Sequence, residues 1–223
     1  MTQIDTLNDI CDARYSCRAF RSDPVDRAII ERIVATAQKI PSWCNAQPWQ
    51  LTIASGAATD AFREALYAHA MTTASVPDLD WPEKYQGVYL DRRRACGFQL
   101  YNAVGIEKGD RPAGAKQMME NFRLFGAPHV ALVTAPKELG PYGAMDSGGF
   151  VAAFTLAAAA QGVATIAQAA IAGHAPMVRA HFGLPEDRNL LCAISFGYAD
   201  PDHPANSFRT ERATPADVID WKD

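Results

Sequence analysis

The chain has 223 residues, of which 48% are hydrophobic and 21% charged, and it carries a formal net charge of −4. These values are typical of a single globular domain, and the acidic excess argues against a general nucleic-acid or anionic-membrane surface, since both select Lys and Arg. The five cysteines are dispersed and never in a C-x-x-C spacing, which predicts neither a disulfide framework nor a zinc site. We therefore expect one cytoplasmic domain over residues 1–223, without a nucleic-acid or membrane partner.

The first third of the chain predicts a helix, then a strand, then a second helix. Apolar residues recur at helical spacing over 22–40, and Pro41 is a stop signal. The run QLTIAS at 50–55 predicts a strand, and a helix is expected near 59–70. The intervening segment PSWCNAQPWQ (41–50) sets polar groups beside tryptophans, which suits a planar heteroaromatic ligand; a turn with packed tryptophans explains it equally well.

Residues 71–126 differ in kind from the rest of the chain. They are rich in aromatic residues, Gly, Pro and charge, and their helical periodicity is weak. We interpret them as short helices and loops that cover an active site, and not as a second domain. The run DRRR at 91–94 is interpreted as a solvated helix face.

The second half predicts three strands and a buried helix. HVALVTA (129–135) is a continuous apolar run of strand length, and the runs at 162–173 and 190–201 are also strand-like. The segment 150–160 is apolar nearly all round, so it predicts a helix in the core or at a subunit interface, and it is too short to span a bilayer. About four strands interleaved with helices indicate an α+β architecture.

Two arginine-bearing stretches, near the two ends of the chain, suit an anion. RYSCRAF places Arg14, Ser16 and Arg18 at every second position, and two fixed cations with a hydroxyl between them suit a phosphate monoester. A solvated polar segment is the alternative. Arg209 and Arg212 form a second fork of positive charge.

In this order, these stretches resemble the nitroreductase family of FMN-dependent flavoproteins. The motifs are R-x-S-x-R-x-F, P-S-x-x-N-x-Q-P-W, NFRLFGAP at 121–128, GVATIAQAA at 162–170, and the closing GY followed by R-T-E-R. The resemblance covers nearly the whole chain. It implies an α+β fold with a mixed sheet flanked by helices, in a domain-entwined homodimer with FMN at the interface and the 150–160 helix in the dimer core.

The resemblance also implies which residues bind the cofactor. Arg14 and Ser16 would hold the FMN phosphate, closed from the C-terminal end by Arg209 and Arg212. Arg18 would reach the pyrimidine edge of the ring, where reduced flavin carries negative charge. Segment 41–45 would cross to the flavin over a subunit boundary, and the backbone of 167–169 would approach flavin N5. The complete expected set is Arg14, Tyr15, Ser16, Arg18, Pro41, Ser42, Trp43, Asn45, Gln117, Asn121, Ala167, Gln168, Ala169, Arg209 and Arg212.

The activity implied is a ping-pong cycle in which NAD(P)H supplies two electrons and a nitroaromatic compound then receives them, passing through nitroso to hydroxylamine. A nitrobenzoate or a dinitroaniline-like compound is the leading substrate prediction. The cover is expected to select it through Trp43, Trp81, Glu83, Tyr85, Tyr89, Phe122, Arg123 and Phe125. No acid–base side chain is strictly required, because the flavin carries the chemistry.

Other activities of the same fold stay open from the sequence. A flavin reductase or a flavin-dependent dehydrogenase would use the same cofactor motifs. A reductive dehalogenase would need a Glu, a Tyr and a Lys in the cover; Glu83, Tyr85 and Lys108 are available, but their spacing differs from that pattern. A non-catalytic flavin-binding protein is the fourth alternative, although storage does not need an aromatic cover.

Overall fold

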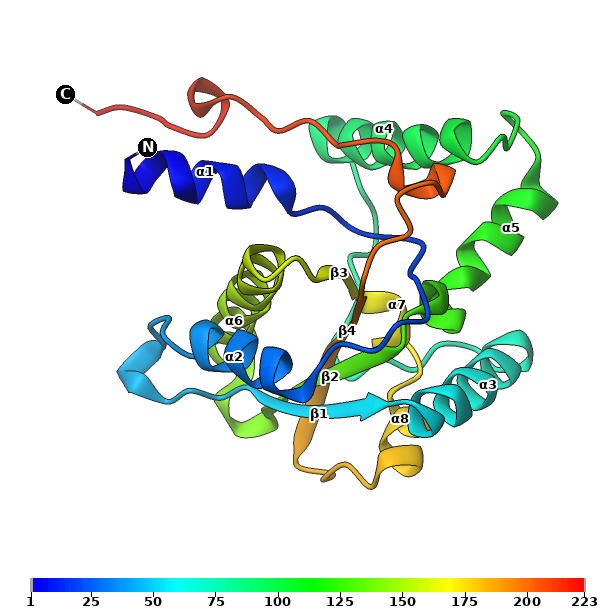
Figure 1. The fold of residues 1–223 in the computed structure, drawn as a ribbon, viewed down its shortest axis with the longest axis horizontal. Helices are drawn as coiled ribbons and strands as arrows, with labels where there is room; N and C mark the ends of the chain where they lie inside the picture. Colours follow the sequence, from blue (N-terminus) through cyan, green and yellow to red (C-terminus); the bar gives the residue numbers. More distant parts are fainter. Residues whose placement is uncertain (1, 223) are drawn as a thin grey trace.

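A four-stranded sheet organises the protein, and its strands lie where the sequence predicts them, although the run at 162–173 is a strand only over Ala164–Gln168 and turns into a short helix at Ala169–Ala172. The computed structural model describes residues 2–222. The strands are β1 (Gln50–Ser55), β2 (His129–Pro136), β3 (Ala164–Gln168) and β4 (Arg188–Gly197), in the spatial order β1-β2-β4-β3. All three ladders are antiparallel, and the one parallel pairing among the described residues is a bridge between Ser16 and Thr165. The α+β class with helices around a sheet is confirmed (Figure 1).

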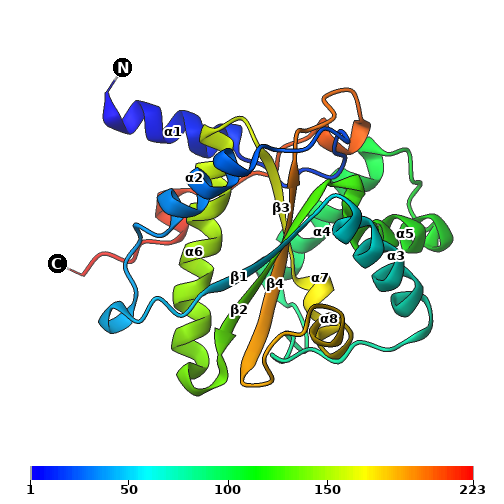
Figure 2. The same ribbon diagram turned by 60° about the horizontal axis from the view of Figure 1, so that its bottom comes forward.

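Helices cover both faces of the sheet. The helices α2 (Arg27–Ala37) and α6 (Gly140–Ala160) lie on one face, and α3 (Ala57–Thr72), α7 (Ala169–Ala172) and α8 (Ala175–Phe182) lie on the other (Figure 2). Successive residues of β2 point to opposite faces, so Val133 joins the core under α6 and Leu132 the core under α3. Both faces are buried, which explains why this strand is a continuous apolar run.

The helix α6 is longer than the apolar run that predicted it. With the turn before it, Lys137–Ala160 is long and apolar enough to cross a membrane by length and composition, in contrast to our expectation for 150–160. In this fold it packs instead on α2 and the sheet through Phe150 and Phe154. Only 33% of its most apolar part is buried, and Tyr142 and Met145 are exposed. Part of the apolar surface of α6 is therefore left uncovered by the rest of this chain.

The region 71–126 contains two helices away from the sheet, α4 (Gly87–Ala103) and α5 (Arg111–Met119), followed by irregular turns over Glu120–Gly126 (Figure 1). Within Gly87–Met119 no residue is buried. The 17-residue α4 is longer than the short helices expected here, because its weak amphipathic pattern concealed its length. The run at 91–94 is exposed on α4, as predicted.

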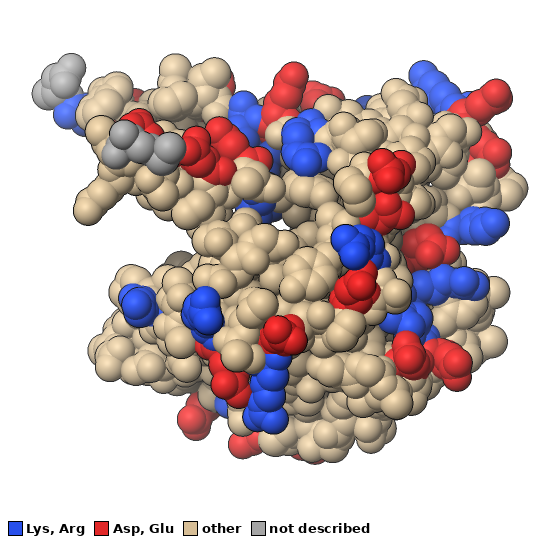
Figure 3. All heavy atoms as spheres, viewed as in Figure 1, with Lys and Arg blue, Asp and Glu red and all other residues tan. Residues whose placement is uncertain are grey.

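The first helix, α1 (Gln3–Ala13), packs on α6 and leads into the arginine-bearing segment 14–20. It begins at a capping box, in which the Thr2 hydroxyl accepts from the Asp5 N–H and the Asp5 carboxylate accepts from the Thr2 N–H. The space-filling view shows basic and acidic side chains interspersed over the face of Figure 1, and not gathered into one basic surface (Figure 3).

Candidate functional site

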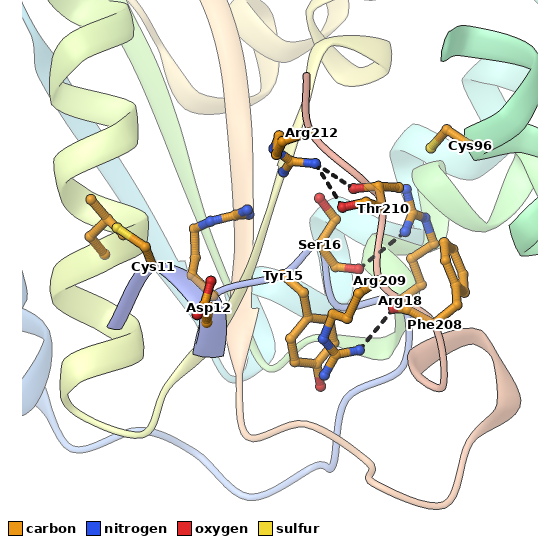
Figure 4. Close-up of a pocket in the computed structure, with 12 residues that line it drawn as sticks. Cys11, Asp12, Tyr15, Ser16, Arg18, Cys96, Phe208, Arg209, Thr210 and Arg212 are labelled. Atoms are coloured by element: carbon orange, nitrogen blue, oxygen red, sulfur yellow. Dashed lines mark hydrogen bonds between the residues drawn. The ribbon is translucent and has the colours of Figure 1, made fainter. Parts of the chain in front are cut away.

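The two arginine-bearing stretches meet around one cavity of 610 Å³ (Figure 4). Its lining includes Arg14, Tyr15, Ser16, Arg18, Arg209 and Arg212, which are six of the residues that the sequence assigned to the cofactor, and one carboxylate, Asp12. Within residues 2–222, none of the four arginines forms a salt bridge. We call this site the cationic cavity, and its unpaired guanidinium groups fit a phosphate.

Pairing with the sheet edge explains why Ser16 and Arg18 reach the cavity whereas Cys17 and Ala19 do not. The Cys17 N–H donates to the Thr165 carbonyl of β3 at 3.0 Å, so the segment runs as an extended strand. Side chains of extended backbone alternate, and Cys17 and Ala19 are buried while Ser16 and Arg18 line the cavity. Burial raises the pKa of the Cys17 thiol, whose Sγ donates to the Ala19 carbonyl, so this cysteine is a packing group.

The arginines of the cavity are oriented before any ligand arrives. The Arg209 guanidinium lies over the Tyr15 ring, 3.6 Å from its centroid, and donates to the Phe208 carbonyl. Arg212 donates to the Thr210 hydroxyl at 2.8 Å (Figure 4). Arg18 donates to the Ser16 carbonyl at 3.1 Å, and burial lowers the pKa of its guanidinium, which nonetheless stays charged. A desolvated cation without a carboxylate partner is a strong attractor for an anion.

A second cavity, of 300 Å³, continues from the first, because both are lined by Ser16 and Arg18. It contains the remaining predicted ring-binding residues, namely Gln117, Asn121, Ala167, Gln168 and Ala169. Leu100, Tyr101, Met118 and Phe125 supply its apolar wall. The site therefore has a cationic end and a largely uncharged end, joined at Arg18.

The side chain of Gln168 is fixed at the junction of β3 and α7. Its Nε2 donates to the Asn121 carbonyl at 2.9 Å, and its Oε1 accepts from the Ser195 hydroxyl at 2.5 Å. Ser195 is fully buried on β4, and our sequence analysis gave it no role. The signal in the sequence was a serine within the apolar run at 190–197, and such a serine does not reveal its partner. This network holds the turn at 167–169 in one conformation.

The segment 41–45 lies elsewhere, between α2 and β1 beside the start of α6. The Trp43 N–H donates to the Asp146 carboxylate, and the Trp43 ring packs edge-on against Tyr142. Cys44 and Asn45 have positive φ angles of 49° and 57°, a conformation that costs energy in residues other than glycine. Pro41, Ser42, Trp43 and Asn45 line neither cavity of their own chain. Their expected contact with a flavin across a subunit boundary stays a prediction.

The predicted substrate residues divide into two groups. Of the candidates near α5, Phe125 lines the second cavity, whereas Phe122 is buried in the core against His174, with 5.1 Å between ring centroids. The Arg123 guanidinium lies over the Tyr67 ring at 4.4 Å. Phe122 is thus placed to support the wall and not to form it.

The other candidates belong to the segment before α4 and to its first turn. Trp81 covers Gly173, where an added Cβ would meet its ring at 2.7 Å, so a larger residue there would displace the Trp81 ring. Glu83, Tyr85 and Tyr89 are exposed, and none of these four residues lines either cavity. Their role at the substrate stays a prediction. Among residues 2–222 no cluster of three His, Cys, Asp or Glu side chains could hold a metal ion.

Comparisons with known proteins agree with this geometry. The family model described as "Nitroreductase family" matches residues 12–198. Nitroreductase NfnB of Mycolicibacterium smegmatis is 39% identical over 204 residues, covering 90% of this chain and 86% of that protein. A 4-nitrobenzoate reductase of Pseudomonas putida is 28% identical over 208 residues, covering 93% and 92%.

Solved structures give the same result for the fold. The crystal structure of the FMN-dependent nitroreductase NfnB from Mycobacterium smegmatis, in complex with NADPH, has a TM-score of 0.93 and 34% identity, covering 99% of this chain and 100% of that chain. The FMN and NADPH-dependent NfnB of Sphigopyxis sp. strain HMH has a TM-score of 0.93 and 32% identity, covering 97% and 99%. The resemblance inferred from the sequence is confirmed, and the chain belongs to the nitroreductase family.

Proposed function

We propose that this protein is an FMN-dependent oxidoreductase that uses NAD(P)H to reduce nitroaromatic compounds in two-electron steps, from nitro through nitroso to hydroxylamine. The observation that carries the proposal is the continuous pair of cavities. One end gathers four arginines without carboxylate partners, and the other presents a largely uncharged wall beside Gln168. The relatives support it, since NfnB of M. smegmatis is an FMN-dependent nitroreductase whose structure was solved with NADPH.

The residues present fit FMN. Arg14, Arg209 and Arg212 with the Ser16 hydroxyl would hold the phosphate, because fixed guanidinium groups suit its geometry and charge. The second cavity would hold the ring, with Gln117 and Asn121 as polar partners and the backbone of 167–169 along one edge. Arg18 lies where the two cavities meet, between the phosphate end and the ring end.

Bound FMN supplies the two-electron chemistry, and this chain supplies position and charge. Arg18 places a half-buried positive charge beside the ring site, where charge that develops in the reaction is stabilised more strongly than in water. Gln168, held by Ser195 and Asn121, keeps the turn at 167–169 in one place. Leu100, Met118 and Phe125 give this end of the site an apolar wall, which suits the flavin ring.

We also propose a homodimer with FMN at its interface. Two observations support it: α6 leaves Tyr142 and Met145 exposed, and segment 41–45 carries exposed polar groups in a strained conformation without a partner cavity in its own chain. Light scattering after size exclusion tests it, and a 24.2 kDa species at micromolar concentration would contradict it. A cytoplasmic location is proposed because all five cysteines are free.

The activity is tested by anaerobic absorbance of the FMN-loaded protein, first with NADPH and then with 4-nitrobenzoate. We expect bleaching by NADPH and return of the oxidised spectrum on adding the nitro compound. Bleaching without recovery, together with electron transfer to free FMN, would favour a flavin reductase. Tight FMN binding with slow bleaching would favour a non-catalytic flavin carrier. Failure to bind FMN would overturn the proposal.

A further inference from the structure

The side chain of Asn206 joins the two arginine-bearing segments without lining the cavity between them. Its Oδ1 accepts from the Arg18 N–H at 2.8 Å, and its Nδ2 donates to the carbonyls of Ala19 at 2.9 Å and Asp200 at 2.8 Å. The residue is only 6% exposed. Both amide hydrogens are therefore used within the protein, and neither is available to a ligand.

Among residues 2–222, Asn206 supplies the hydrogen bonds that join 201–212 to 14–20, and the contact of the Arg209 guanidinium with the Tyr15 ring accompanies them. Backbone hydrogen bonds pair Arg21 with Tyr198 and Asp200 with Ala19. Beyond Asp200 the chain leaves this pairing, and within residues 2–222 every hydrogen bond between 14–20 and 201–212 runs through the Asn206 side chain. The same residue's carbonyl accepts from Arg209 at 2.9 Å. Asn206 thus contacts the backbone of one cavity arginine and the guanidinium of another.

We propose that Asn206 is a positioning residue for phosphate recognition, which sets the distance between the arginines of 14–18 and those of 209–212. The inference rests on the proposed function, since it assigns the cationic cavity to the FMN phosphate. Without the Asn206 side chain the same charges remain, but the segment 201–212 is held less firmly against 14–20, so ligand binding has to order it further. That ordering lowers affinity for the phosphate and leaves the ring site unchanged.

The test compares FMN with riboflavin, which has the same ring and no phosphate. Flavin fluorescence quenching measures both dissociation constants for wild type and Asn206→Ser. We expect FMN affinity to fall about tenfold, a loss typical of newly required side-chain and loop ordering, with riboflavin affinity nearly constant. Asn102→Ser on the exposed surface of α4 is the matched control, and both its dissociation constants should equal those of wild type.

Equal losses for FMN and riboflavin in Asn206→Ser would overturn the inference, because they would indicate a general scaffold role. A wild-type protein that binds the two flavins equally would instead overturn the phosphate assignment in the proposed function. Hydrogen exchange of the wild-type protein without flavin gives a reading that needs no variant to fold. The Arg18 N–H, held by Asn206, should exchange slowly, and fast exchange would show that the segments are not positioned in advance.

Discussion

The segments that form the cationic cavity are firmly fixed to the rest of the protein, whereas the cover helices α4 and α5 are not. Segments from the two ends of the chain form the cavity, and buried hydrogen bonds fix them through Cys17 and Asn206. The cover helices α4 and α5 contain no buried residue, and Tyr89 is 67% exposed. Recognition of a constant group such as a phosphate benefits from fixed charges, whereas a surface with few buried contacts can adjust to different acceptors.

The boundary between these two behaviours lies inside the region 71–126. Its first part, residues 73–81, is fastened to the body of the protein. The Val76 N–H donates to the Gly173 carbonyl, and the Asp78 carboxylate accepts from both Arg179 and the Leu190 N–H at 2.7 Å. We therefore regard 73–81 as a fixed strap and α4 with α5 as the adjustable part.

The largest expected effect comes from breaking the strap. Asp78→Ala removes a carboxylate that is 13% exposed from an Arg179 side chain that is 10% exposed. It leaves a nearly buried cation whose remaining partners are the exposed Glu186 carboxylate at 3.5 Å and the Arg188 carbonyl, so we expect a loss of about 3 kcal/mol in the free energy of unfolding by urea. Glu31→Gln, which breaks the exposed Arg27–Glu31 pair on α2, is the control, with an expected loss of about 0.5 kcal/mol or less. Similar losses in both variants would mean that the strap is not fixed.

The next effect concerns the cavity itself. Arg14→Ala should weaken FMN binding by about 1.5–3 kcal/mol, because it removes a charge-assisted contact from a half-buried position. The dissociation constant is measured by flavin fluorescence, with Arg27→Ala as a control at an exposed arginine. An Arg14 variant that purifies with full and equally tight flavin would remove this residue from the phosphate site.

A smaller effect is expected on the pH dependence of the fixed core. Burial lowers the pKa of His129, whose Nε2 accepts from the Val25 N–H at 2.8 Å and whose Nδ1 contacts the Ser55 hydroxyl. Because the folded pKa lies below the unfolded value, the unfolded state binds more protons as pH falls. The His129 contribution is therefore complete above about pH 6.5 and is lost as pH falls towards its folded pKa.

The measurement is the urea midpoint between pH 5 and 8. Wild type should lose stability towards pH 5, and His129→Gln should show a shallower slope, whereas His203→Gln, at an exposed position, should keep the wild-type slope. Identical slopes in all three proteins would indicate that the charge on His129 does not couple to folding. His174, whose pKa is also lowered by burial, keeps some slope in the His129 variant.

The smallest effect on stability is expected in the cover. Tyr89→Ala should change the free energy of unfolding by less than about 0.5 kcal/mol, because the side chain is exposed. FMN affinity should stay unchanged while KM for the nitro substrate rises, as measured in steady-state assays with 4-nitrobenzoate. Loss of FMN in this variant would show that the first turn of α4, and not only its residues at the second cavity, helps to hold the cofactor, and that the contrast between cavity and cover is too simple.

Much of the fold follows from local patterns that the sequence displays. The apolar run at 129–135 became a strand buried on both faces, and such burial is what a continuous apolar run indicates, whereas the edge strand β1 is largely exposed. Side chains from Ser16 to Ala19 alternate between the cavity and the interior, because this part of RYSCRAF pairs with β3 as extended backbone. Helix α4 was underestimated for a physical reason: with no buried face, it has no amphipathic period to detect.

The sequence was sufficient for the class of fold and the family, and it predicted which charged groups would form a cofactor site, because each depends on residue type and short-range spacing. Only the tertiary structure decided that residues 14–18 and 209–212 enclose one cavity, and that Ser195 and Asn206 hold its two ends. The tertiary structure also showed that Phe125 lines the site and that Phe122 lies in the core, although the two were equivalent candidates in the sequence. The reason is that a buried hydrogen bond pairs groups far apart in the chain, and neither partner's neighbours along the sequence indicate which group it will meet.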